Sequence, residues 1–188
     1  MMKRIASLIF ALLMLAVSAV ALEMEGVQIP ETINQADGTQ LVLNGAGIRS
    51  KFVFDIYIGQ LYLKEKNTDA AAVIQADTGK RIAMHFLYSE VGKDKLVDGW
   101  NEGFEGNGTK EQLAALKGQI DAFNAMFDTV KEGDEIILDY IPGTGTTVTI
   151  KGMNKGTIPG KAFNDLLLAI WIGEEPVTDD LKDEMLGK

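Results

Sequence analysis

The sequence predicts an α+β fold, in which a mainly antiparallel β-sheet carries a layer of helices on one face. Segments rich in Val, Ile, Phe and Tyr fill much of the first half of the chain, as expected of strands. Helix-like segments with apolar stripes follow, and a strand–turn–strand pattern around residues 142–145 separates them from two further helices. Blocks of strands and helices in this order favour α+β over an alternating α/β fold.

The longest β-rich stretch covers residues 41–64. We expect it to form one strand to about Ser50 and a second strand over residues 52–63. Near its start, Gly45-Ala46-Gly47 allows either a tight turn or the close approach of another segment. The other expected strands are residues 26–30, 39–43, 80–89, 135–141, 146–151 and, at an edge of the sheet, 153–157.

Helix signals are clearest after Thr109, which forms a capping box with Gln112. The helix that follows carries a continuous apolar stripe. The stripe consists of Leu113, Leu116, Ile120, Phe123 and Phe127. The other expected helices are residues 69–75, 92–104, 160–172 and a last one capped by Thr178.

Residues 1–21 have the form of a secretory signal peptide. Lys3 and Arg4 precede an apolar run, and Ala19-Val20-Ala21 fits a small-residue cleavage site. The apolar run is short for a bilayer span, so an uncleaved membrane anchor is the weaker alternative. The sequence therefore predicts a signal peptide over residues 1–21, one domain over residues 22–188 and export to a periplasm.

Composition argues against several classes of function. Cleavage after Ala21 leaves 167 of the 188 residues and removes two basic ones, which changes the net charge from −9 to −11. So acidic a chain repels nucleic acid. It has one histidine and no cysteine, so disulfides and zinc-type clusters are absent, and no phosphate-binding glycine motif occurs. We expect no cofactor, no metal, no nucleic-acid partner and no stable membrane anchor; the oligomeric state is left open.

Arg49 is the candidate for ligand binding, because it is a charge inside an apolar, β-rich stretch. A guanidinium is always charged, and its planar fork fits a carboxylate. In an apolar cleft it would select an anionic head group. The alternative is a structural arginine, paired with an acid such as Asp55 or pointing to solvent.

Three segments resemble the chalcone isomerase family, in the order in which that family has them. They are GAGIRSKFVFDIYIGQLYL with its arginine turn, GDEIILDYIPGTGTTVTIKGMNKGTIPGKAF with its hairpin, and LLLAIWIGEEPVTDDLKDEMLG with its C-terminal helices. The resemblance implies an open-faced β-sandwich with a cleft between the sheet and the helices. That family includes plant isomerases, fatty-acid-binding relatives and bacterial secreted relatives, and this chain resembles the last group.

The resemblance also implies site residues. The family's cleft arginine matches Arg49, a threonine of the isomerases falls on Tyr57, and a lysine falls on Lys95. The tyrosine and asparagine that complete the isomerase donor set fall on Gly92 and Gly99. Cyclisation of a chalcone needs donors that stabilise the developing enolate, so this set is incomplete for that reaction.

We therefore expect a non-catalytic periplasmic protein that binds a fatty acid or another small apolar carboxylate through Arg49, Tyr57 and Lys95. One alternative is an intramolecular lyase acting on an unknown substrate. Another is an interaction module without a ligand, whose cleft is plugged by Phe, Trp and Met side chains. Arg49 and Tyr57 would lie roughly 26 Å apart in an unbroken strand, so they share a site only if the chain reverses near Ser50.

Overall fold

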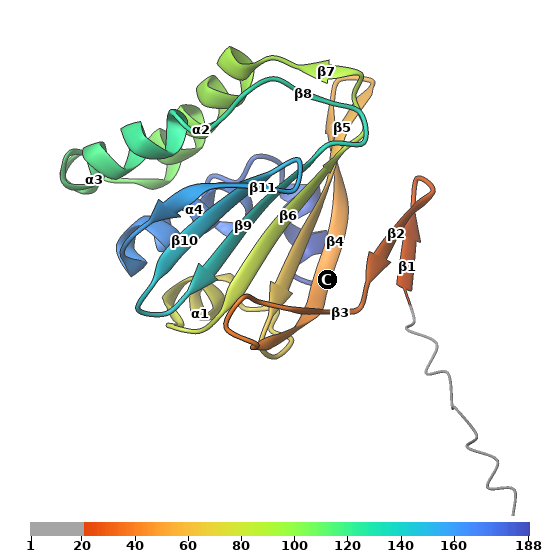
Figure 1. Cartoon of the computed structure of the whole chain (residues 1–188), viewed down its shortest axis with the longest axis horizontal. Helices are drawn as coiled ribbons and strands as arrows, with labels where there is room; N and C mark the ends of the chain where they lie inside the picture. The colour runs from red at the N-terminus through yellow and green to blue at the C-terminus, as the bar shows by residue number, and fades with distance from the viewer. Residues whose placement is uncertain (1–20) are drawn as a thin grey trace, which may run out of the picture.

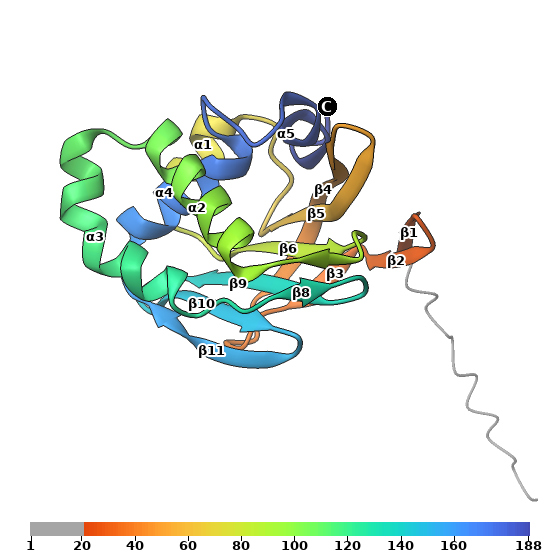
Figure 2. The same cartoon turned by 90° about the horizontal axis from the view of Figure 1, so that it is seen from above.

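The computed structural model describes residues 21–188, so the expected signal peptide lies outside the described residues apart from Ala21. Its centre is a seven-stranded antiparallel sheet with the helices on one face (Figures 1 and 2). The strand order is β11 (Met153–Ile158), β10 (Gly145–Ile150), β9 (Glu135–Ile141), β6 (Lys80–Phe86), β5 (Phe54–Leu63), β4 (Gln40–Lys51) and β3 (Thr32–Asn34). The predicted α+β class, with an antiparallel sheet and one helical layer, is confirmed.

Five helices and two short strand pairs complete the described chain. The helices are α1 (Ala70–Gln75), α2 (Lys93–Asn107), α3 (Lys110–Asn124), α4 (Lys161–Ile172) and α5 (Asp179–Met185). The pairs are β1 (Ala21–Met24) with β2 (Val27–Pro30) and β7 (Glu90–Val91) with β8 (Val130–Lys131). Among residues 21–188, no helix has both the length and the apolar character needed to cross a bilayer.

Helix α4 is the centre of the helical layer. It contacts β10 of the sheet and all four other helices. Its last seven residues, from Leu166 to Ile172, are all buried. A helix that is apolar on every side needs partners on every side, and α4 has them. The main core therefore lies between α4 and the helix-facing side of the sheet.

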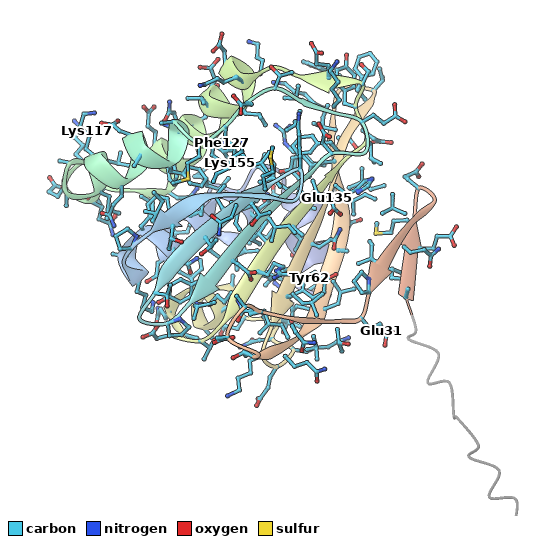
Figure 3. The ribbon with its side chains drawn as sticks, in the orientation of Figure 1. Glu31, Tyr62, Lys117, Phe127, Glu135 and Lys155 are labelled. Atoms are coloured by element: carbon cyan, nitrogen blue, oxygen red, sulfur yellow. The ribbon has the colours of Figure 1, made fainter. Side chains whose placement is uncertain are left out.

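A second, smaller apolar cluster lies on the opposite face of the sheet. Ile58 and Tyr62 of β5 pack there with Ile29 of β2, and all three are buried. The Tyr62 hydroxyl donates a hydrogen bond of 3.0 Å to the carbonyl of Pro30, which ties the N-terminal hairpin to the sheet (Figure 3). The β1–β2 hairpin thus covers part of the face that the helices leave open.

Glycines of β4 let α5 lie directly on the sheet. A Cβ on Gly45 would stand 2.1 Å from the carbonyl oxygen of Glu184, and a Cβ on Gly47 would stand 1.8 Å from its carboxylate. The expectation of a turn at residues 45–47 is wrong, because β4 runs unbroken to Lys51. The other expected role, close approach of another segment, is the one that these glycines have.

Adding a methyl group at Gly45 tests this contact. We expect Gly45→Ala to lower the free energy of unfolding by about 1–3 kcal/mol, because its Cβ meets backbone atoms that cannot move without displacing α5. Gly99→Ala is the matched control, since nothing lies within 4 Å of a Cβ there. In the interior of α2 it should raise stability by about 0.5–1 kcal/mol. Urea unfolding measures both, and equal effects would contradict the packing described.

Candidate functional site

Arg49 and Tyr57 lie directly opposite each other on β4 and β5. The chain reverses at Phe52 and Val53, and the antiparallel register then pairs Arg49 with Tyr57. A chain reversal near Ser50 is the condition under which Arg49 and Tyr57 can share a site. Directly opposed side chains lie on the same face of a sheet. The Arg49 guanidinium carbon lies 5.8 Å from the centre of the Tyr57 ring, within the range of a cation–π contact.

Tyr57 anchors this pair to the core between the sheet and the helices. Its ring packs against Phe86 at a centroid distance of 5.6 Å, and its hydroxyl accepts a hydrogen bond of 3.0 Å from the indole Nε1 of Trp171 in α4. Burial raises the pKa of Tyr57, while the nearby Arg49 charge and the Trp171 hydrogen bond act against that shift to a smaller extent. The hydroxyl therefore stays protonated at neutral pH and keeps a proton to donate.

The two arginines of residues 21–188 are in opposite situations. Arg81 forms an ion pair with Asp139 and donates to it from Nε at 3.0 Å. Arg49 is half-buried, and its Nε is shielded from solvent without a hydrogen-bond partner among the described residues. Within the same residues no carboxylate oxygen pairs with it inside 4.0 Å. Arg49 is thus a cation at the edge of the core, and residues 21–188 offer it no acceptor.

The acids that might have paired with Arg49 make other bonds. Asp55 accepts a hydrogen bond of 2.6 Å from the Ser50 hydroxyl. Glu184, which packs over Gly47 on the same face of β4, accepts one of 3.2 Å from the backbone N–H of Ile48. The expected alternative, a structural pair of Arg49 with Asp55, is therefore not formed.

A second donor without an acceptor lies close to this site. The indole Nε1 of Trp100 is buried and has no partner among the described residues. Its ring lies 5.7 Å from that of Trp171, which is the residue that bonds Tyr57. Arg49, Tyr57 and Trp100 thus each present an N–H or O–H without a recorded acceptor in residues 21–188. Buried polar groups in folded proteins almost always have partners, so these donors are available to an acceptor from outside the described residues.

Aromatic side chains fill the space behind the site. From Trp100 the ring contacts continue to Phe127 at 5.3 Å, from Phe127 to Phe123 at 4.7 Å and from Phe123 to Phe163 at 5.4 Å. Phe127 follows the end of α3 and is labelled in Figure 3. The resemblance implied a cleft between sheet and helices. In the described chain, packed rings occupy this space, and five surface cavities found elsewhere are lined by residues other than Arg49.

Lys95, the third predicted ligand-binding residue, is exposed in the first turn of α2. No hydrogen bond or ion pair is recorded for it among the described residues, so its part in the site stays a prediction. Gly92 is the N-cap residue of α2 and Gly99 lies within that helix. Neither has a side chain that can donate; that these positions correspond to the tyrosine and asparagine of the isomerases stays a prediction from the resemblance.

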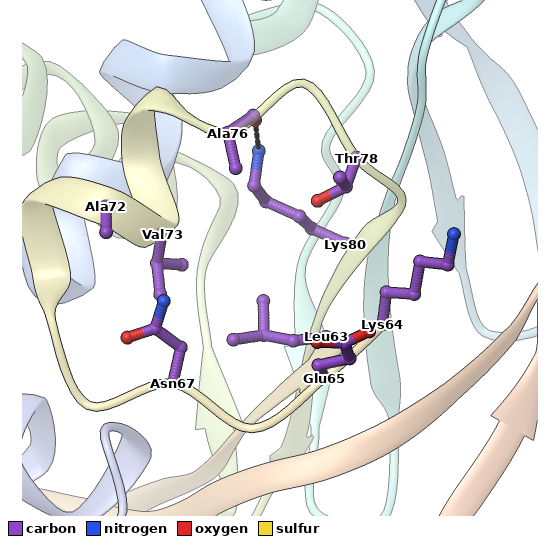
Figure 4. Close-up of a pocket in the computed structure, with 9 residues that line it drawn as sticks. All are labelled: Leu63, Lys64, Glu65, Asn67, Ala72, Val73, Ala76, Thr78 and Lys80. Carbon is purple, nitrogen blue, oxygen red and sulfur yellow. Dashed lines mark hydrogen bonds between the residues drawn. The ribbon is translucent and has the colours of Figure 1, made fainter.

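A cavity that the sequence did not indicate lies at Lys80, beneath α1. It has a volume of about 290 Å³ and is lined by Lys80, Leu63, Asn67 and Val73, among others (Figure 4). The Lys80 ammonium donates to the carbonyl of Ala76 at the C-terminal end of α1, where a positive charge is favourable. It also lies 5.1 Å from the centre of the Tyr140 ring. Through these contacts Lys80 has a structural role: it stabilises the C-terminal end of α1.

Burial lowers the pKa of Lys80 to about 8 from its ordinary value of 10.5. Between pH 8 and 10.5 the unfolded chain therefore binds a proton that the folded chain lacks, and the free energy of unfolding rises with pH. Above pH 10 the buried tyrosines, whose pKa is raised, act in the opposite direction. We expect a rise of about 1–2 kcal/mol from pH 8 to pH 10 in urea unfolding.

Lys80→Met is the control for that experiment, because methionine keeps the apolar stem and removes the titrating group. Its stability should not rise over the same two pH units. A rise of the same size in Lys80→Met would mean that another group causes it.

The fold and the site together define a class of protein: one α+β domain whose antiparallel sheet holds a half-buried arginine on the side covered by helices. The chain belongs to the chalcone isomerase-like family, whose sequence model matches residues 21–187. No curated protein matches the chain.

A solved structure with a similar fold is the crystal structure of a fatty-acid binding protein from Arabidopsis thaliana. The TM-score is 0.67 at 17% sequence identity, and the match covers 89% of this chain and 95% of the plant chain. This likeness concerns the fold, and it confirms the chalcone-isomerase-like open-faced β-sandwich that the sequence resemblance implied.

Proposed function

We propose that this domain binds a small apolar carboxylate, such as a fatty acid, in the periplasm after removal of residues 1–21, and that it does so without catalysing a reaction. The observation that carries the proposal is the state of Arg49. The residue is half-buried, its Nε is shielded from solvent without a partner among the described residues, and the nearby acids are bonded elsewhere. A charge kept in that state destabilises the empty domain, and an anion from outside would remove the cost.

The chemistry of the surrounding groups favours a carboxylate. An ionised carboxylate only accepts hydrogen bonds, and it can take two from one guanidinium. Arg49 and the Tyr57 hydroxyl both have protons to donate on the same face of the sheet. Hydrogen bonds to charged groups contribute about 1.5–3 kcal/mol each, enough to decide between an acid and a neutral analogue.

The apolar part of the ligand would lie against the core beside Arg49. Phe86 and Trp171 are buried next to Tyr57, and Ile56 packs against the same cluster. Since packed rings occupy the interior, a compact tail, or one that displaces a ring, fits better than a long rigid one. A fatty-acid binding protein among similar folds supports this class of ligand.

The filled interior also favours a second candidate, an interaction module without a small ligand. This alternative predicted a cleft plugged by Phe, Trp and Met side chains, and the packing of Trp100, Phe123 and Phe127 supports it. It leaves the donors at Arg49 and Trp100 without an explanation, and for that reason we rank it second.

Calorimetric titration of residues 22–188 with decanoate and with decanol separates the two candidates. We expect saturable binding of decanoate and weaker binding of the alcohol, because only the acid carries the charge. Arg49→Gln should reduce decanoate affinity by about 10- to 100-fold and leave decanol affinity within twofold. The Trp171 hydrogen bond to Tyr57 makes tryptophan emission a second readout.

Two further variants complete the design. Lys110→Gln removes an exposed charge at the start of α3 and controls for net charge; decanoate affinity should not change. Lys95→Gln asks whether Lys95 belongs to the site. No saturable decanoate binding in the unaltered domain, or equal losses in Arg49→Gln and Lys110→Gln, would overturn the proposal.

A further inference from the structure

We propose that the turn of the β4–β5 hairpin docks this domain onto a lipid bilayer, with Phe52, Val53 and Phe54 as the inserted side chains. The fractional exposures of these residues are 92%, 86% and 51%. They are consecutive, whereas the other large exposed apolar side chains of residues 21–188, those of Leu22 and Met153, stand alone. Isolated exposed apolar residues are ordinary, but a contiguous group indicates an interaction surface.

The hairpin projects beyond its neighbour in the sheet. Strands β4 and β5 stay paired out to Lys51 and Phe54, while β5 pairs with β6 only from Tyr57 onward. The turn lies at one end of the sheet next to β7 (Figure 1). There Phe54 packs edge-on against Tyr88 at a centroid distance of 5.4 Å. The three apolar side chains can therefore enter a surface before the rest of the sheet meets it.

The residue types of this turn are unusual for its backbone conformation. Two-residue hairpin turns usually contain Gly, Asn or Asp, because at least one position needs a positive φ. Here the positions are Phe52 and Val53, and Phe52 has a φ of 58°. A bulky residue in the left-handed region is a steric outlier. Exposed aromatic side chains at a strained turn, which the core does not need, point to binding.

The chemistry of the turn fits a lipid interface. Lys51 stands exposed beside the apolar residues, where its ammonium can meet lipid phosphates. Tyr88 has the amphipathic ring that favours the head-group region. Asp55, the acid that directly follows the turn in sequence, accepts a hydrogen bond from Ser50. Glu90 of the neighbouring β7 forms an ion pair with Lys131. Because the whole chain carries a net charge of −9, a zwitterionic bilayer suits it better than an anionic one.

The position of Arg49 connects this surface to the proposed site. Phe52 follows Arg49 by three positions along the strand, a rise of roughly 10 Å. Insertion of the turn by about 5–10 Å would hold Arg49 near the head-group boundary, where the carboxylate of a membrane-dissolved fatty acid lies. Transfer of the ligand between bilayer and site is the part that rests on the proposed function. Docking itself depends only on the turn.

Vesicles of phosphatidylcholine test docking in the absence of any carboxylate. The protein is the domain of residues 22–188, which contains the whole described core. We expect it to sediment with sucrose-loaded vesicles, and the double variant Phe52→Asp/Val53→Asp to bind at least tenfold more weakly. Met153→Asp is the matched control, since it removes an exposed apolar side chain on β11, the opposite edge strand of the sheet. Its binding should stay within twofold.

A direct readout uses brominated phosphatidylcholine, which quenches tryptophan inside the bilayer. Emission of Phe52→Trp should be quenched, and that of Met153→Trp should not. Absence of vesicle binding, or equal effects at both positions, would overturn the proposal. Dimers that the turn variant dissociates, without vesicle binding, would overturn it in favour of self-association. Loss of decanoate binding alone would refute the carboxylate site and leave docking intact.

Discussion

The antiparallel pairing of β4 with β5 is the interaction on which the site depends. It sets Arg49 opposite Tyr57, so that a charge lies against a buried ring on the side of the sheet that the helices cover. The same pairing brings Gly47 opposite Gly59, which leaves a shallow strip of backbone where α5 can rest. It also pushes an apolar turn beyond the end of β6. The register of β4 and β5 thus determines the position of Arg49, the place where α5 packs and the exposure of the turn.

Around that pairing the domain combines a well-packed core with donors that the core does not satisfy. The rings from Trp100 to Phe163 pack closely, as expected of a domain that has no cysteine and depends on its core for stability. Arg49 and Trp100 nevertheless keep buried N–H groups without partners in the described chain. Arg81, on the same sheet, forms an ion pair with Asp139 and donates to it from Nε. The contrast supports a ligand-binding role for Arg49.

Much of the fold could be predicted from the sequence, because periodicity and capping are local. The capping box at Thr109 and the strand from Glu135 to Ile141 appear as expected. The short strands β1, β3, β7 and β8 were missed, since two to four residues carry too little pattern. The sequence left two roles open for Gly45 and Gly47, a turn or a close approach, because the choice depends on Glu184, far along the chain.

The candidate site was predictable only in part. A charge in an apolar strand indicated Arg49, and the family resemblance added Tyr57. The bonds that occupy Asp55 and Glu184, and the donor on Trp100, are facts of three-dimensional packing with no local signal. The hydrogen bond from Lys80 to the C-terminal end of α1 also has no local signal, because it forms only where the end of a helix meets the start of a strand.

The central claim is that Arg49 binds an acceptor that does not belong to the chain. Residues 22–188 contain only two arginines, so a ¹⁵N-labelled sample gives two Nε–H resonances, with the paired Arg81 as internal reference. On addition of decanoate, the Arg49 resonance should move downfield and saturate while that of Arg81 stays in place. If neither resonance moves, or if Arg49 is already hydrogen-bonded without decanoate, the account is contradicted.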